Sequence, residues 1–152
     1  MTSVLFVCLG NICRSPLAEG SFAHLVHEAG LEGQITYDSA GNGAWHEGDP
    51  PDPRAVNIAA QNNIDISNQK SRPMQVSDFT HFDLILCMDH DNIAKVERIR
   101  PKNTTATIDL FLNHTLDINA AVPNPYYGAR DGFERVFEQI MIANQALLEK
   151  LT

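Results

Sequence analysis

A cysteine and an arginine near the start of the chain have the types and the spacing that phosphoryl transfer requires. Five residues separate Cys8 from Arg14, and Ser15 follows the arginine directly. A thiolate at Cys8 is a strong nucleophile, and the guanidinium of Arg14 can offer two parallel N–H donors to a tetrahedral anion. Ser15 can either donate a hydrogen bond to the thiolate or cap a helix. This pattern predicts phosphoryl transfer through a phosphocysteine intermediate.

These groups fall between a predicted strand and a predicted helix. Residues 4–7 form a short apolar run typical of a buried strand, and apolar residues recur at helical spacing over 17–29, before Gly30. Backbone N–H groups of the loop and of the helix N-terminus attract an anion and favour the thiolate form of Cys8. The competing interpretation is a core cysteine beside a surface cation. The residues expected to hold the phosphate are Leu9, Gly10, Asn11, Ile12, Cys13, Arg14 and Ser15.

The rest of the chain predicts an α/β fold in three layers. Strands that alternate with helices imply one domain over 1–152, with an open, parallel, four-stranded sheet covered by helices on both faces. Ligands bind such sheets beyond the carboxyl ends of the strands, where Cys8 lies. Asp52 and Asp89 each precede a predicted helix and are interpreted as its cap. The polar residues at 89–92 could also suggest a metal site, but a helix cap is the favoured interpretation. Further strands are expected at 34–39, 83–88 and 105–110, helices at 53–62, 92–99 and 131–151, a helical turn at 78–82, and loops at 40–53 and 111–122.

Aromatic residues gather in two predicted loops. Trp45 lies in a stretch rich in glycine and proline, and Tyr126 and Tyr127 follow the second of two closely spaced prolines. Exposed rings in such loops can stack on a flat substrate. The alternatives are that Trp45 anchors its loop on the body of the protein, and that the tyrosines pack against the final helix.

Composition limits the classes of partner and compartment. The 152 residues carry a formal net charge of -8, which disfavours nucleic acids and anionic membranes as partners. No apolar run approaches the ~18 residues of a membrane span, and the N-terminus shows no secretory signal. Three cysteines, an odd number, indicate a reducing cytoplasm. The predicted chemistry requires no metal and no organic cofactor.

Two segments of the chain match the motifs of a known family. The run from Cys8 to Pro16, Cys-Leu-Gly-Asn-Ile-Cys-Arg-Ser-Pro, resembles the signature loop of the low-molecular-weight protein tyrosine phosphatases, in particular the bacterial type. Residues 39–46, Ser-Ala-Gly-Asn-Gly-Ala-Trp-His, resemble the second loop of that family. The resemblance implies a flavodoxin-like strand order and hydrolysis of phosphotyrosine in a partner protein, which for bacterial members is often a tyrosine kinase.

The resemblance also assigns roles to single residues. Asn11 would brace residues 9–15, the anion loop, by side-chain hydrogen bonds, and the segment around Arg72 would support this loop. Cys13 would form a reversible disulfide with Cys8 and so protect the nucleophile from irreversible oxidation. The walls of the substrate crevice would be Trp45, Tyr126 and Tyr127.

The general acid of the family is missing at its expected place. The family's loop reads Asp-Pro-Tyr-Tyr, and its aspartate protonates the leaving oxygen, whereas this chain has Asn124 there. An amide has no proton to give at neutral pH, and loss of a positioned acid typically costs roughly 10²–10⁴ in rate. Asn124 can be a replacement introduced to stall turnover, a natural feature of a slow enzyme, or a change compensated by another acid such as Asp131.

Two other functions compete with that of a slow phosphatase. With Asn124 in place, the protein could bind phosphotyrosine without hydrolysing it. Arsenate reductases share the predicted fold and the Cys-x5-Arg loop, but they pass oxidation to two further cysteines. Here only Cys87 follows Cys13, in a predicted buried strand. The binding module is therefore the nearer rival.

Overall fold

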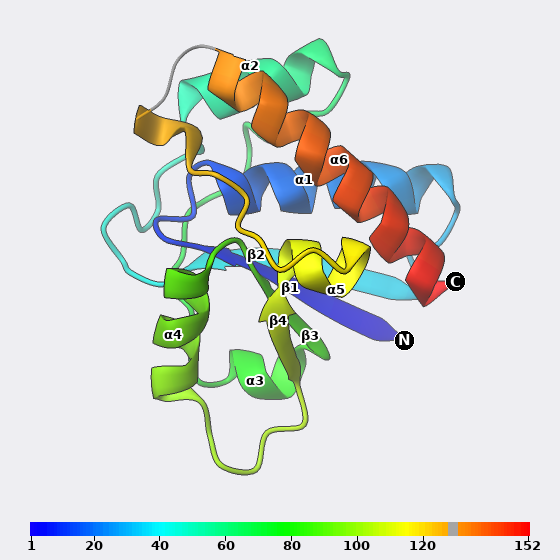
Figure 1. The fold of residues 1–152 in the computed structure, drawn as a ribbon. Coiled ribbons are helices and arrows are strands. Elements are labelled where there is room, and N and C mark those ends of the chain that lie inside the picture. The colour runs from blue at the N-terminus through cyan, green and yellow to red at the C-terminus, as the bar shows by residue number, and fades with distance from the viewer. Residues whose placement is uncertain (128–130) are drawn as a thin grey trace.

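Four parallel strands form the centre of the molecule (Figure 1). The computed structural model describes residues 1–127 and 131–152. All neighbouring strands pair in parallel, so the predicted open parallel sheet with a flavodoxin-like strand order is confirmed. The strands are β1 (Thr2–Cys8), β2 (Ile35–Gly41), β3 (Leu84–Cys87) and β4 (Thr107–Leu110), in the spatial order β2-β1-β3-β4.

Helices cover both faces of the sheet, as Figure 1 shows. Successive side chains of a strand point to opposite faces, and β1 illustrates this. Its fully buried Val4 and Phe6 pack with α1 and α6, whereas its fully buried Leu5 and Val7 pack with α3 and α4. The helices are α1 (Arg14–Glu28), α2 (Pro53–Gln61), α3 (Asp78–His81), α4 (His90–Ile99), α5 (Phe111–Leu116) and α6 (Asp131–Leu151), and a 3-10 turn, η1, spans Pro125–Tyr127.

The segment after β4 shows that one prediction was wrong. The loop expected at 111–122 begins with α5, a helix of 6 residues that buries Phe111, Leu112 and Thr115. The ring of Phe111 packs edge-on against that of Phe6, with centroids 5.5 Å apart. Such a short helix cannot display a periodic apolar pattern, and tertiary contacts stabilise it instead.

The helices at the carboxyl edge of the sheet begin at the predicted caps. The side chain of Asp52 accepts a hydrogen bond from the backbone N–H of Arg54 at 2.8 Å and caps α2. Asp89 and Asn92 cap α4 reciprocally, each side chain bonding to the other's backbone N–H. Among the described residues, no group of three or more His, Cys, Asp or Glu side chains is arranged to hold a metal ion. A search of the same residues finds no helix with the length and apolarity needed to cross a membrane.

Candidate active site

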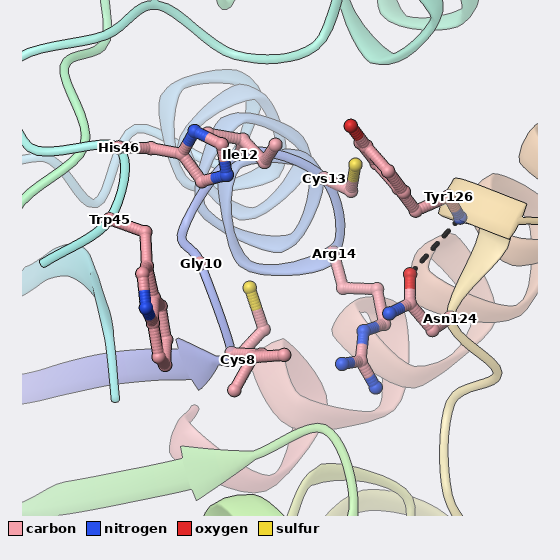
Figure 2. A pocket seen from close by; sticks show the side chains of 10 residues that line it. Cys8, Gly10, Ile12, Cys13, Arg14, Trp45, His46, Asn124 and Tyr126 are labelled. Carbon is pink, nitrogen blue, oxygen red and sulfur yellow. Dashed lines mark hydrogen bonds between the residues drawn. The ribbon is translucent and has the colours of Figure 1, made fainter. Parts of the chain in front are cut away.

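Cys8 ends β1 and lies in a pocket with a cavity volume of about 240 Å³ (Figure 2). After Cys8 the chain turns through a loop in which Asn11 has a left-handed backbone, with φ of 58°. Helix α1 then begins at Arg14, so the arginine and Ser15 belong to its first turn. The structure thus brings the predicted nucleophile, arginine and aromatic loops to one place. The residues that line the pocket are Cys8, Leu9, Gly10, Ile12, Cys13, Arg14, Trp45, His46, Asn124 and Tyr126.

The sulfur of Cys8 is 3.0 Å from the hydroxyl oxygen of Ser15. Ser15 is fully buried in α1, and the N-cap residue of that helix is Cys13, whose side chain makes no capping bond. Of the two roles predicted for Ser15, the structure therefore shows the contact with the thiol. A hydroxyl at this distance can donate to a thiolate and stabilise negative charge on the sulfur.

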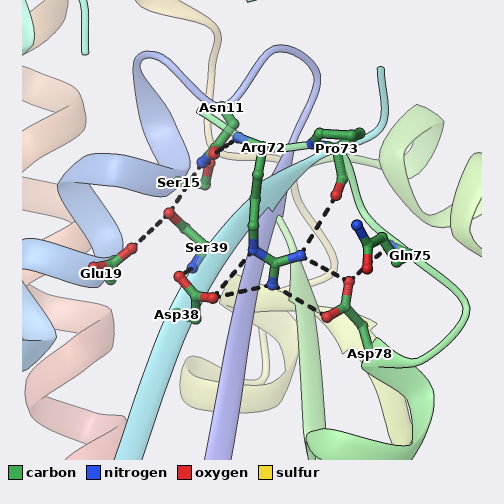
Figure 3. A network of polar contacts seen from close by, with 9 residues as sticks. All are labelled: Asn11, Ser15, Glu19, Asp38, Ser39, Arg72, Pro73, Gln75 and Asp78. Atoms are coloured by element: carbon green, nitrogen blue, oxygen red, sulfur yellow. Dashed lines mark hydrogen bonds and ion pairs between the residues drawn. The ribbon is translucent and has the colours of Figure 1, made fainter. Parts of the chain in front are cut away.

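Asn11 ties the anion loop to two neighbouring segments (Figure 3). Its amide nitrogen donates to the hydroxyl of Ser15 at 2.8 Å and to the hydroxyl of Ser39, in β2, at 3.0 Å. Its side-chain oxygen accepts from the backbone N–H of Arg72 at 3.0 Å. Three side-chain hydrogen bonds thus hold Asn11 in its left-handed backbone conformation, and this fixes the shape of the loop.

A half-buried carboxyl group ends this network. The hydroxyl of Ser39 donates to Glu19 at 2.7 Å. Desolvation raises the pKa of Glu19 from 4.5 to about 7, and the hydrogen bond from Ser39 and the nearby Arg72 offset only part of that rise. The Arg72 guanidinium is itself bound by Asp38 and Asp78, each at 3.1 Å. Glu19 therefore changes its charge close to neutral pH.

Arg14 is held in the pocket by two other parts of the chain. Its Nη1 donates to the carboxylate of Asp89 at 2.7 Å and to the backbone carbonyl of Val122 at 3.0 Å. The side chain is buried although it lines the pocket. Because a guanidinium is planar and rigid, two bonds at one nitrogen fix the direction of its other donors.

Aromatic rings stand on opposite sides of the pocket in Figure 2. Trp45 is 68% exposed, and its ring lies over Gly43, where an added Cβ would come within 2.1 Å of a ring carbon. Tyr126 faces it from the 3-10 turn, next to Asn124. The side-chain oxygen of Asn124 accepts the backbone N–H of Tyr126 at 3.0 Å, and its amide nitrogen lies toward the guanidinium of Arg14. The expected acid position thus holds an amide.

All three cysteines of the chain are free and buried. Cys13 lines the pocket together with Cys8, and burial raises the pKa of the Cys13 thiol to about 12. Burial in β3 also raises the pKa of Cys87. Cys13 and Cys87 therefore remain protonated at neutral pH. Cys8 is the thiol that contacts the hydroxyl of Ser15.

Three residues of the site escaped prediction as members of it. His46 lines the pocket, Asp89 binds Arg14 in addition to capping a helix, and Glu19 closes the hydrogen-bond network. Asp89 follows a strand at the same sheet edge as Cys8, and this signal could have paired it with Arg14. Glu19 gives no such signal, because a glutamate on a helix is usually solvated. Tyr127 is a predicted crevice wall and Asp131 a predicted alternative acid, and the side chains of both lie outside the part of the protein that the structure describes.

Comparisons with known proteins agree on one family. Residues 3–152 match the model described as low molecular weight phosphotyrosine protein phosphatase. A relative of that name from Schizosaccharomyces pombe is 41% identical over 150 residues, which cover 97% of this chain and 96% of its own. The low molecular weight protein-tyrosine-phosphatase YfkJ of Bacillus subtilis is 40% identical and covers 99% of this chain and 96% of its own. A crystal structure of a protein tyrosine phosphatase from Entamoeba histolytica is 36% identical, with a TM-score of 0.92 over 99% of this chain and 97% of that one.

Proposed function

Because the chain belongs to the low molecular weight phosphotyrosine protein phosphatase family, we propose that it hydrolyses phosphotyrosine in proteins through a phosphocysteine intermediate. The observation that carries the proposal is the placement of Cys8. Its sulfur is 3.0 Å from the hydroxyl of Ser15, in a pocket that Arg14 also lines. A nucleophile, an anion clamp and an aromatic entrance are the parts that cleavage of an aryl phosphate needs.

The reaction runs in two steps on the sulfur of Cys8. In the first, the thiolate attacks phosphorus, an S–P bond forms and the bond to the aryl oxygen breaks. The loop amides and the guanidinium of Arg14 hold the equatorial oxygens during this transfer. In the second, water attacks the phosphocysteine, inorganic phosphate leaves, and the sulfur departs as a thiolate that Ser15 stabilises.

The depth of the nucleophile favours an aromatic substrate. Cys8 is only 3% exposed, so a substrate must carry its phosphate into the pocket on a long side chain. The rings of Trp45 and Tyr126 leave a slot between them that suits a phenyl group. Phosphoserine is shorter and has no ring to stack, which supports phosphotyrosine as the substrate.

Asn124 makes the first step slow. The amide cannot protonate the leaving oxygen, and its own oxygen already accepts a backbone N–H. Loss of a positioned acid typically costs roughly 10²–10⁴ in rate. The same residue supports a second candidate, a phosphotyrosine-binding module in which the pocket holds the phosphoryl group and turnover is negligible.

We further propose Cys13 as the redox partner of Cys8. Peroxide oxidises the Cys8 thiolate to a sulfenic acid with release of hydroxide, and the Cys13 thiol condenses with it to give a disulfide and water. Turnover needs Cys8 in its reduced form, which fits a cytoplasmic location. The partner is a phosphotyrosine-bearing protein, with tyrosine kinases as the candidates that the bacterial family members suggest.

The test compares the chain, Asn124→Asp and Cys8→Ser on a phosphotyrosine peptide. We expect Asn124→Asp to raise kcat by roughly 10²–10⁴, Cys8→Ser to abolish hydrolysis in either background, and the matching phosphoserine peptide to react poorly. Equal rates for the chain and Asn124→Asp would overturn the role of position 124. Tight peptide binding without hydrolysis by either form would favour the binding module.

A further inference from the structure

Arg54, in the first turn of α2, contacts three elements around the pocket. Its Nε and Nη2 donate to the two oxygens of the Asp52 carboxylate at 3.0 and 2.9 Å, and its Nη1 donates to the backbone carbonyl of Tyr126 at 3.2 Å. The guanidinium also lies over the rings of Tyr126 and Phe133, 5.2 and 4.8 Å from their centroids. One side chain thus joins the start of α2 to the 3-10 turn and to α6.

Asp52 attaches this arginine to the anion loop. The backbone N–H of Asp52 donates to the carbonyl of Ile12 at 2.8 Å, and its carboxylate, only 8% exposed, is held between Arg54 and the N-terminus of α2. The hydrogen bond from Arg54 lowers the pKa of Asp52. Asp52 is therefore an ionised anchor fixed to the loop that follows Cys8.

Tyr126 extends the contacts to the residue at the acid position. Its backbone N–H donates to Asn124 at 3.0 Å, and both side chains stand at the edge of the pocket (Figure 2). Residues 118–124, all of them described, form neither helix nor strand. The placement of this segment therefore depends on tertiary contacts. A continuous series of hydrogen bonds thus runs from Ile12 through Asp52, Arg54 and Tyr126 to Asn124.

We propose that Arg54 is a positioning residue, which fixes how far the segment with Asn124 and Tyr126 lies from the anion loop. This inference rests on the proposed function, because the position of residue 124 matters where an aryl oxygen leaves. Arginine suits the task, since its fork binds a carboxylate with two donors while a third reaches a carbonyl and its face stacks on rings. Arg54 does not line the pocket and acts through Tyr126.

The test measures kcat and KM of Arg54→Met on a phosphotyrosine peptide, in the chain and in Asn124→Asp. With an acid present, a displaced loop misplaces it, and since an error of about 1 Å can cost ~100-fold, we expect kcat to fall roughly 10- to 100-fold. With Asn124 there is no acid to misplace, so kcat changes little. KM rises in both backgrounds because Tyr126 shifts. Inhibition by inorganic phosphate stays constant because the loop around Cys8 is intact.

Arg100→Met is the matched control. Arg100 is 42% exposed, against 46% for Arg54, and pairs with Glu97 at 3.3 Å on α4. If Arg54→Met fails to fold, Arg54→Lys replaces it and should show a smaller loss in the same direction, because lysine keeps the charge but not the fork. Equal kcat losses in both backgrounds, or no larger loss than in Arg100→Met, would overturn the positioning role.

Failure of the proposed function gives a different result. In that case Asn124→Asp itself hydrolyses nothing, and the dissociation constant of the phosphotyrosine peptide becomes the readout. Arg54→Met should then weaken binding while Arg100→Met leaves it unchanged. Equal affinities of both variants would again overturn the role of Arg54.

Discussion

The guanidinium of Arg14 donates to the carboxylate of Asp89 across 2.7 Å and so joins the segment after β1 to the segment after β3. These two strands are neighbours and run parallel, which places their carboxyl ends at one edge of the sheet. The other oxygen of Asp89 accepts the backbone N–H of Asn92 at 2.8 Å. One carboxylate therefore orients the arginine of the pocket and begins a helix.

Asp89→Asn separates these two tasks. Asparagine caps helices as well as aspartate does, so the midpoint of thermal unfolding should change little. The charged bond to Arg14 is lost, and since such bonds are worth about 1.5–3 kcal/mol, kcat/KM for p-nitrophenyl phosphate should fall about 10- to 100-fold. Asp65→Asn is the control, because Asp65 accepts a backbone N–H from Ser67 at 2.9 Å on the surface. An unchanged kcat/KM in Asp89→Asn would show that Arg14 needs no such orientation.

Gly43→Ala tests the role of Trp45 as a wall. The new Cβ would lie 2.1 Å from a ring carbon of Trp45, so the ring must move. We expect a higher KM for aryl phosphates, unchanged inhibition by inorganic phosphate, and a shift in the fluorescence of Trp45, the chain's single tryptophan. In Gly33→Ala the added Cβ has no neighbour within 4 Å, and no change is expected. A fluorescence shift without a change in KM would rule out the wall.

Glu19 gives a pH dependence of stability with an unusual sign. Burial raises its pKa from 4.5 to about 7, so between these values the folded state holds a proton that the unfolded state has lost. The free energy of unfolding therefore falls as pH rises through this window. Glu19→Gln removes the effect.

The pH dependence due to Glu19 is measured by urea unfolding of Glu19→Gln and of the parent at about pH 5 and about pH 8. From about pH 5 to about pH 8, the free energy of unfolding of the variant should rise relative to that of the parent by about 1–3 kcal/mol, since one pKa unit corresponds to ~1.4 kcal/mol. Glu149→Gln, at an exposed position of α6, should show no such trend. A stability difference that is independent of pH would contradict a raised pKa of Glu19.

The sequence predicts those parts of the site that are local in the chain. Cys8, Arg14 and Ser15 belong to one strand-loop-helix unit, and apolar patterning locates the strand and the helix. Contacts between distant segments leave no comparable pattern. The bonds from Arg14 to Asp89 and from Arg54 to Tyr126 span 75 and 72 positions, and they depend on strand order and loop placement.

The sequence does not predict structural features that depend on tertiary packing. Helix α5 exists because Phe111 packs on the sheet, and propensity alone does not favour 6 residues of helix. The same holds for Glu19, whose partial burial follows from the way α1 covers β2 and not from its own side chain. The sequence therefore predicts the polar network behind the anion loop only in part, through Asn11 and the segment around Arg72.

The most direct test of Cys8 as the nucleophile is the mass of the protein during turnover. The chain is mixed with p-nitrophenyl phosphate, whose leaving group needs little protonation, and quenched in acid. Because Asn124 also cannot activate water for the second step, a phosphoryl adduct should accumulate, map to Cys8 by peptide fragmentation, and be absent from Cys8→Ser. Release of nitrophenol by Cys8→Ser at the parent's rate, or an adduct on another residue, would contradict the phosphocysteine mechanism.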